Sequence, residues 1–512
     1  MRRLTSILML VVALAALGGA AWLNPRLTAR RAEQHLVQAA PTETMPPLLA
    51  FTTITFGGFR GIVADMLWLR ASELQDCGQY FELVQLADWI TKLEPRFTTV
   101  WAFQAWNMAY NISVLLNDYQ ERWRWVRQGI SLLRDSGLKY NPGSAGLYNE
   151  LAWLFFHKMG QDSDQAHFVY KREWALEMMT LFGGPQPDFA RLRAVPTGER
   201  ELLQRAAASN VVAALRQLDV DPFSGAWLAA SNRPPAVAKI LDDSPGARAV
   251  LDFIRVQQMR ALYKLDPAAM EQADREHGPL DWRLPDAHAV YWAAQGKRFA
   301  KDFDAVKADR QIFQALADAF RQGRLLLNTE ENLFILSPNL DLLPRVHGYY
   351  LQARREHPGE DTVKIAHANF LKEAINNLYL FHRNQEAATW FDELKQRYPD
   401  AAGTNTLDNF VAANLTENLD ALSSDEAIAQ IEGTAYQSAF WLVAGDPDRA
   451  AGLDQLARRI WQRYMDKRDD PLFRERTGLP PYEELRRQAF TRARDAARSE
   501  AGRARLDAAL PR

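Results

Sequence analysis

Between residues 62 and 181, apolar residues recur every three to four positions, which is the spacing of one face of an α-helix. Six segments share this spacing: 62–75, 80–93, 99–115, 120–136, 145–159 and 165–181. Pro95, Pro142 and Pro185 follow the second, fourth and sixth of them. Because proline breaks a helix beyond its first turn, the pattern predicts three consecutive helix pairs within residues 57–185.

After Pro185 the pattern is looser. Prolines are frequent in residues 186–245, where we expect loops and one helix at 197–218. Further helices are predicted at 246–264, 298–323, 406–419, 424–443, 447–467 and 481–509. Residues 331–352 are expected to have mixed secondary structure. No stretch alternates convincingly between apolar and polar residues over six or more positions. The sequence therefore predicts an all-α protein with almost no sheet.

Residues 4–23 contain no charge, and twenty helical residues span about 30 Å, the thickness of a bilayer core. Two interpretations compete for this segment. A cleaved signal peptide could use Gly19-Ala20-Ala21 as its cleavage site. An uncleaved transmembrane anchor fits the full length of the segment and Trp22 at its end, because tryptophan suits the membrane interface. We favour the anchor, for which residues 1–23 form one domain.

The orientation of the anchor follows from the basic residues around it. Arg2 and Arg3 favour a cytoplasmic N-terminus, although Arg26, Arg30 and Arg31 compete from the other side. We therefore expect a single-pass membrane protein whose soluble region lies outside the cytoplasm, on the periplasmic side. The expected domains are an anchor at 1–23, a proline-broken juxtamembrane linker at 24–56, helical repeats at 57–185, an irregular helical region at 186–330 and a C-terminal helical region at 331–512.

Two segments resemble the tetratricopeptide repeat, a pair of antiparallel helices in 34 residues with a proline near its end. The first is ADMLWLRASELQDCGQYFELVQLADWITKLEP, residues 64–95, in which Ala71, Leu83, Ala87 and Ile90 take the core positions. It lacks the Gly-Tyr pair of the first helix, and Leu83 stands where the family has a small residue. The second is FLKEAINNLYLFHRNQEAATWFDELKQRYP, residues 370–399, which is closer to the family.

The resemblance implies an irregular, tetratricopeptide-like solenoid of helix pairs. The units that end at Pro142 and Pro185 are longer than 34 residues, so a regular array is not expected. Stacked helix pairs form an extended concave face that binds an extended peptide or a helix. The resemblance thus favours a protein-binding scaffold with an unidentified protein partner.

Composition narrows the function classes further. The net charge is −2, so no overall field attracts nucleic acid. Cys77 is the only cysteine, which excludes an intramolecular disulfide and a cysteine-based zinc site. Of the 15 tryptophans, eight lie between Trp68 and Trp174 and would fill a core or a binding surface. On the helix at 99–115, Trp101 lies in the apolar stripe and is assigned to the core, whereas Trp106 lies off the stripe and is the candidate for a binding face.

Candidate chemistry is sparse. The chain has no GxGxxG, GxxxxGK[ST], HExxH or GxSxG motif, so we predict no catalytic residue, no cofactor and no small-molecule substrate. One cluster, His157, Asp162, Asp164 and His167, has ligand types that could bind a divalent cation across one turn. The alternative is a polar turn in which Asp164 caps the following helix.

A second cluster consists of Asp281, Asp286 and His288, since a carboxylate near a histidine can support a general base. The alternative there is that Asp286 is a helix N-cap. The sequence therefore leaves two hypotheses for function. The first is a membrane-anchored helical-repeat scaffold at the cell envelope, and the second is a metal-dependent envelope hydrolase that uses His157, Asp164 and His167.

Overall fold

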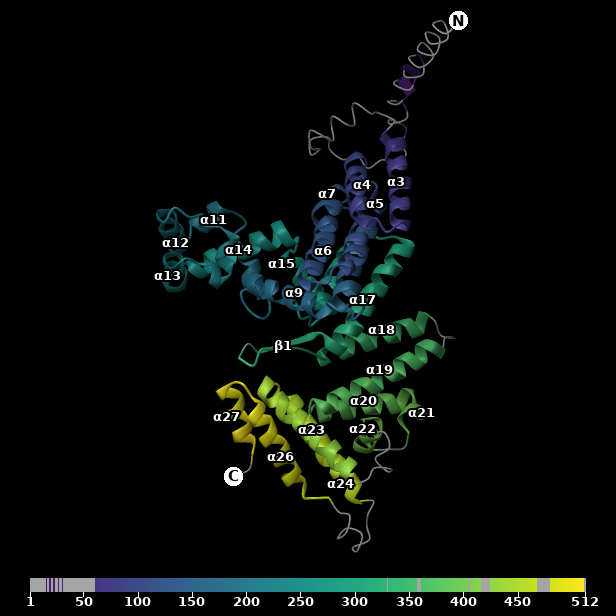
Figure 1. The fold of residues 1–512 in the computed structure, drawn as a ribbon, viewed down its shortest axis with the longest axis vertical. Coiled ribbons are helices and arrows are strands. Elements are labelled where there is room, and N and C mark those ends of the chain that lie inside the picture. The colour runs from purple at the N-terminus through teal and green to yellow at the C-terminus, as the bar shows by residue number, and fades with distance from the viewer. Residues whose placement is uncertain are drawn as a thin grey trace. The chain divides into compact units, whose positions relative to one another are not determined.

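The computed structural model describes residues 60–328, 330–356, 361–403, 406–415, 424–466 and 479–510, together with seven isolated positions between 15 and 30 (Figure 1). The expected anchor at 4–23 and linker at 24–56 therefore lie almost wholly outside the described residues. Among the helices that are described, none is both long enough and apolar enough to cross a bilayer. The chain divides into two compact units, Met1–Leu147 and Tyr148–Arg512, and each is described by itself.

The described part of the first unit consists of packed helices. They are α3 (Arg60–Asp76), α4 (Tyr80–Leu93), α5 (Thr98–Trp106), a π turn (Asn107–Ile112), a 3-10 turn (Ser113–Leu115), α6 (Tyr119–Ser131), a second π turn (Leu132–Gly137) and α7 (Leu138–Tyr140). The predicted core positions Ala71, Leu83, Ala87 and Ile90 are all buried between α3 and α4. The first two predicted helix pairs are therefore confirmed as packed pairs.

Helices α5 and α6 approach each other closely at one glycine. A β-carbon added to Gly129 on α6 would lie 2.8 Å from the carbonyl oxygen of Ala105 on α5. Real β-carbons essentially never come that close to a backbone atom, so the contact requires glycine. The side-chain size at this one position therefore sets the distance between the second pair of helices.

Helix α8 (Ala145–Trp153) crosses the boundary between the units, and the second unit continues through many helices. In its first part these are a π turn (Leu154–Gly160), α9 (His167–Phe182), α10 (Phe189–Arg193), α11 (Glu199–Leu203), α12 (Ala206–Gln217), α13 (Pro235–Asp243), α14 (Ala247–Gln258), a π turn (Met259–Tyr263), α15 (Pro267–His277), α16 (Pro285–Lys297) and α17 (Asp302–Gln322). After a hairpin follow α18 (Leu343–Glu356), α19 (Asp361–Leu380), α20 (Asn384–Arg397), α21 (Pro399–Ala402), α22 (Leu407–Leu415), α23 (Ser424–Ala444), α24 (Pro447–Asp466), α26 (Tyr482–Ala496) and α27 (Glu500–Ala509).

The closer of the two repeat-like segments, residues 370–399, coincides with the helix pair α19 and α20. Tyr379, Phe391 and Leu394 are buried in this pair. The expected helix at 481–509, by contrast, is two helices, α26 and α27. The carboxylate of Glu331 accepts the backbone N–H groups of Arg498 and Ser499 between them, and Ser499 caps α27 through the amide of Gly502. These polar contacts end one helix and begin the next.

Strands β1 (Arg324–Asn328) and β2 (Leu333–Ser337) form an antiparallel hairpin, the only sheet in the described part of the chain. The fold class is therefore all-α, as predicted. One face of the hairpin, with Leu325 and Leu336, packs near Ala175 and Leu284. The other face packs against a cluster that includes Trp441 on α23. The central residues of β1 and the first four of β2 are apolar, as is typical of strands covered on both faces, so no alternation marks them in the sequence.

Candidate interaction groove and buried polar clusters

A groove of about 540 Å³ lies along one face of α17 and one face of α18. Helix α17 contributes Val306, Asp309, Arg310 and Phe313, and α18 contributes Arg345, Gly348, Tyr349 and Gln352. Both sets follow the three-and-four spacing of a single helix face. The groove therefore lies between one row of side chains on each helix, and Glu276 of α15 and Lys297 of α16 also line it.

Exposed apolar side chains extend the groove along α17. Phe303 is 77% exposed and Val306 is 55% exposed, and with Phe313 they lie on one face of the helix. Phe299 is also exposed, just before α17, and stacks on Tyr148 at 5.7 Å between ring centroids. Single exposed apolar residues are common, but an apolar row that runs into a groove is typical of a protein-binding surface.

The charges around the groove are mixed, with a small basic excess. Lys297 pairs with Asp309 at 2.5 Å between Nζ and Oδ1, and Arg345 donates to the backbone carbonyl of Arg275 at 2.9 Å. Arg310 is exposed and forms no ion pair with any described residue. The lining holds three basic residues (Lys297, Arg310 and Arg345) and two acidic ones (Glu276 and Asp309), a net of one positive charge. Such a rim favours a partner segment with a carboxylate.

Tyr349 links the groove to α15. Its hydroxyl lies 3.2 Å from Nδ1 of His277. Burial raises the pKa of Tyr349 to about 12 and lowers the pKa of His277. Both groups are therefore neutral near pH 7, and they form a hydrogen bond that suits binding rather than acid–base chemistry.

The predicted cluster at 157–167 does not come together around a cation. The Asp164 carboxylate is bonded to Nζ of Lys158 at 2.5 Å, to the hydroxyl of Tyr170 at 2.9 Å and to the amide of Ala166 at 2.9 Å. Burial opposes ionisation of Asp164, but the Lys158 ammonium and the other donors outweigh it and lower the pKa to about 2. Asp164 therefore neutralises a buried lysine and bonds an amide just before α9, whose N-cap is Ala166.

The two histidines of that cluster have other neighbours. His157 stacks on Trp153 at 4.7 Å between ring centroids, and Nδ1 of His167 lies 3.2 Å from Nζ of Lys171. Asp162 is exposed. Across the described ranges, no three His, Cys, Asp or Glu side chains are placed so that they could hold a metal ion. The cysteine that the sequence offers, Cys77, is exposed on the surface.

The sequence position of Asp286 suggests that it is the N-cap of α16, but in the structure it is not. The helix begins at Pro285 and Leu284 is the N-cap, so Asp286 lies inside the first turn with its side chain buried. Its Oδ1 atom has no hydrogen-bond partner among the described residues and lies against Gly160, where an added β-carbon would be 3.1 Å from it. Burial and the neighbouring Asp318 raise the pKa of Asp286 to about 7, while Lys171 opposes the rise.

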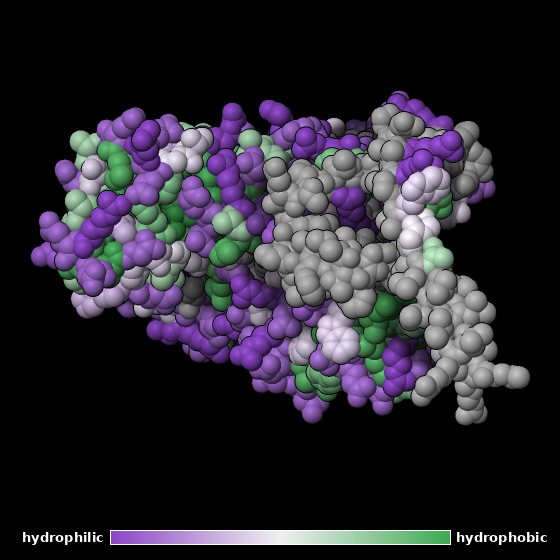
Figure 2. All heavy atoms as spheres, turned by 90° about the horizontal axis from the view of Figure 1, so that it is seen from above, coloured by the Kyte–Doolittle hydropathy of each residue, from purple (hydrophilic) through white to green (hydrophobic). Residues whose placement is uncertain are grey.

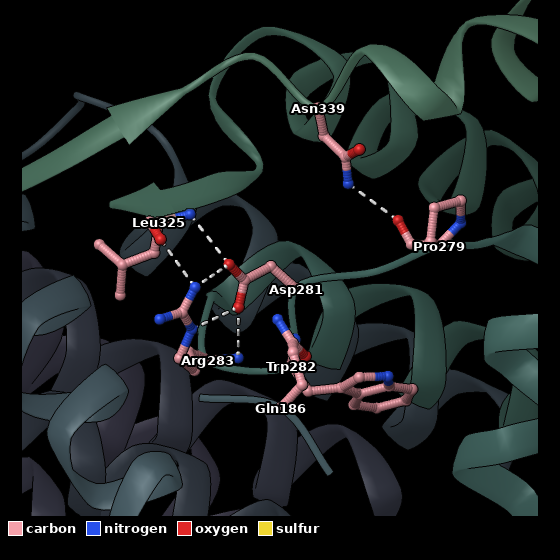
Figure 3. A network of polar contacts seen from close by, with 7 residues as sticks. All are labelled: Gln186, Pro279, Asp281, Trp282, Arg283, Leu325 and Asn339. Carbon is pink, nitrogen blue, oxygen red and sulfur yellow. Dashed lines mark hydrogen bonds and ion pairs between the residues drawn. The ribbon is translucent and has the colours of Figure 1, made fainter. Parts of the chain in front are cut away.

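Asp281 and His288 also have structural partners. Asp281 forms an ion pair with Arg283 and accepts the amide of Leu325 at 2.9 Å, and Figure 3 shows these groups meeting at the first strand of the hairpin. His288 is fully buried, with Nε2 3.0 Å from the carbonyl oxygen of Trp282. In the structure, Asp281 bonds Arg283 and the backbone of β1, and Nε2 of His288 lies next to a backbone carbonyl.

Trp101 and Trp106, on α5 of the first unit, are placed as predicted. Trp101 is 4% exposed, and its ring N–H donates to the carbonyl of Pro95 at 2.9 Å. Trp106 is 39% exposed and stacks on Tyr110 at 5.5 Å between ring centroids. The assignment of Trp101 to the core is confirmed, and Trp106 is available at the surface of its unit.

The groove itself was not predicted. Its residues lie on α17 and α18, and the signal that the sequence offers is the run Phe299, Phe303 and Val306, which places aromatic and aliphatic residues off the buried stripe of α17. That signal is weak because exposure is a property of the packed helices. Comparison with known proteins adds no assignment, since no family model, no curated protein and no solved structure matches the chain.

Proposed function

We propose that this protein is a membrane-anchored scaffold that binds a protein partner at the cell envelope, with the groove between α17 and α18 as its docking site. The observation that carries the proposal is the exposed apolar row of Phe303 and Val306, which leads into a 540 Å³ groove with a basic rim. The tetratricopeptide-like resemblance of residues 64–95 and 370–399 supports a helical-repeat scaffold. The uncharged segment 4–23 supports a single-pass anchor with the soluble region on the periplasmic side.

The matching partner segment is an amphipathic helix or short peptide. Its apolar residues would contact Val306 and Phe313, and a carboxylate would reach Arg310. Recognition of this kind depends on a few buried side chains near the centre of the interface. The rim charges would contribute orientation and association rate more than affinity.

The test compares two exposed aliphatic residues of the second unit. The full-length chain carrying Val306→Ser is cross-linked in native membranes, purified and analysed by quantitative mass spectrometry, with Ile365→Ser on α19 as the matched control. We expect Val306→Ser to lose the partners that wild type and Ile365→Ser both recover. Equal recovery by all three would contradict the groove as the docking site.

The membrane part of the proposal has its own test. Removal of residues 1–23 should release a folded protein from membranes washed with high salt, and protease added to intact spheroplasts should digest the soluble region of the full-length chain. Retention of the truncated chain on washed membranes would show another attachment. Metal analysis addresses the hydrolase hypothesis, which stoichiometric zinc or manganese in the purified chain would favour.

A further inference from the structure

The hairpin of β1 and β2 has two outer edges, and side chains bond the backbone of Leu325 on the β1 edge. At β1, Asp281 Oδ2 accepts the backbone N–H of Leu325 at 2.9 Å, and Arg283 Nη2 donates to the carbonyl oxygen of Leu325 at 2.7 Å (Figure 3). Arg283 and Asp281 are themselves bonded at 2.7 Å. The ion pair thus supplies the acceptor and the donor that a neighbouring strand would supply.

Among the described residues, no side chain bonds the outer edge of β2 in this way. The register places Leu336 opposite Leu325 and Phe334 opposite Leu327. In an antiparallel ladder the backbone groups of opposite residues point the same way relative to the pair, inward or outward, and the direction alternates along the strand. Because the groups of Leu325 point outward, those of Leu336 and Phe334 also point outward. No described residue forms a hydrogen bond with them.

The sequence of β2 lacks three of the devices that protect an edge strand. Leu333-Phe334-Ile335-Leu336-Ser337 contains no charge, no proline and no bulge, and its first four side chains are only partly buried. Natural proteins avoid leaving such a strand uncovered, because unpaired N–H and C=O groups are a template for another strand. At the pair Leu325 and Leu336, side chains bond the outward backbone groups of Leu325 only, and those of Leu336 have no bond to a described residue.

We propose that the outer edge of β2 binds an extended segment of a partner protein, which adds a third strand to the hairpin. The inference rests on the scaffold function proposed above and names a second, backbone-directed contact for it. Outward donors and acceptors that recur at every second residue match an extended chain. A helix uses its backbone groups internally and has no such row to offer.

The side chains of the hairpin define the chemistry of the added strand. Both faces of the hairpin are apolar, since Phe334 and Leu336 lie on one face and Leu333 and Ile335 on the other. A strand beside β2 extends both faces. The partner segment should therefore carry apolar residues at consecutive positions and no proline at the residues whose N–H groups face β2.

The probe is a synthetic peptide with the sequence of residues 331–339, which contains β2 itself and can pair with β2 in antiparallel register. It is added to the full-length chain in lipid nanodiscs, and hydrogen exchange is followed at single residues. In the free chain, the amides of Phe334 and Leu336 should exchange faster than those of Leu333 and Ile335, which face β1. Bound peptide should slow the two edge amides by about tenfold or more.

Two controls distinguish backbone pairing from nonspecific binding of the peptide. The same peptide with N-methyl groups on its edge-facing amides should have no effect. In the chain, Leu336→Pro removes an outward N–H and leaves the ladder to β1 intact, so it should abolish the peptide effect. Leu336→Val keeps that N–H and should preserve the effect. Protection of the Ile335 amide in both variants reports that the hairpin is still folded.

Three outcomes would overturn the proposal: edge amides already protected in the free chain, a methylated peptide that acts like the unmethylated one, or no slowing at saturating peptide. Protection that rises with protein concentration alone would assign the edge to a second copy of the chain instead. If cross-linked partners depend on Val306 while the peptide has no effect, the scaffold function stands and the strand-addition site falls. If the peptide binds but Val306→Ser recovers every partner, the strand-addition site stands and the groove between α17 and α18 falls as the docking site.

Discussion

Lys158 Nζ lies 2.5 Å from Asp164 Oδ2, and each of the two side chains is only 2% exposed. The pair closes the turn that leads from the π turn at Leu154–Gly160 into α9. Tyr170 and the amide of Ala166 satisfy the remaining acceptor capacity of the carboxylate. Removing one member of a buried pair leaves an uncompensated charge, and that penalty exceeds what the pair contributes over an apolar equivalent.

We therefore expect Asp164→Asn to destabilise the protein by about 3–5 kcal/mol, measured by guanidinium denaturation at pH 7. Asp162→Asn is the matched control in the same turn, because Asp162 is exposed, and should change stability by less than about 0.5 kcal/mol. Equal effects of the two substitutions would mean that Lys158 does not depend on Asp164.

The buried carboxyl group of Asp286 predicts that the stability of the protein depends on pH. A carboxyl group whose pKa rises on folding, here from 3.8 to about 7, binds its proton more tightly in the folded state. Its contribution to stability is then fully present below about pH 4 and is lost as the pH rises towards 7. The cause is burial beside Asp318, which the charge of Lys171 only partly offsets.

Asp286→Asn should flatten that slope. Thermal melts at pH 5 and pH 8 should differ less for the variant than for wild type, by an amount that corresponds to at most about 3 kcal/mol. Asp318 has a raised pKa as well, so part of the slope should remain. A variant with the same difference between pH 5 and pH 8 as wild type would show that Asp286 is ionised throughout.

The helix pairs were predictable from the sequence because each has a long apolar stripe that faces its partner. Ala71, Leu83 and Ile90 illustrate this, since spacing alone placed them correctly in the core. The buried charges were not predictable in the same way. Lys171 and Asp286 are 115 positions apart in the sequence, and only tertiary packing brings them close enough to interact.

The hairpin escaped prediction for a different reason. Leu325 and Leu326 face opposite sides, but both sides are covered, so the strand reads as one short apolar run. Periodicity cannot distinguish such a run from a piece of helix. The groove along α17 escaped because Phe303 is an apolar residue at a helical position, and its exposure depends on what the other helices leave uncovered.

Gly129 gives a prediction about packing. Gly129→Ala should destabilise the first unit by about 1–3 kcal/mol, because the new methyl group would meet the carbonyl of Ala105 at 2.8 Å and force α5 and α6 apart. Gly146→Ala is the matched control. Its nearest neighbour would be 3.9 Å away, and alanine should be neutral or stabilising by up to about 1 kcal/mol in a helix. If both variants melt alike, the close approach of the two helices is adjustable.

Trp101 and Trp106 test whether the first unit also offers a binding surface. Trp101→Ala should cost about 3–5 kcal/mol, because it removes a buried ring and its hydrogen bond to Pro95. Trp106→Ala should cost less, since the ring is 39% exposed and its contact is a stack on Tyr110. Thermal melts compare the stability of the two variants. Cross-linking in native membranes measures whether Trp106→Ala weakens partner recovery. A Trp106→Ala protein that melts as low as Trp101→Ala would make that ring part of the core, and the groove on α17 would be left as the docking surface.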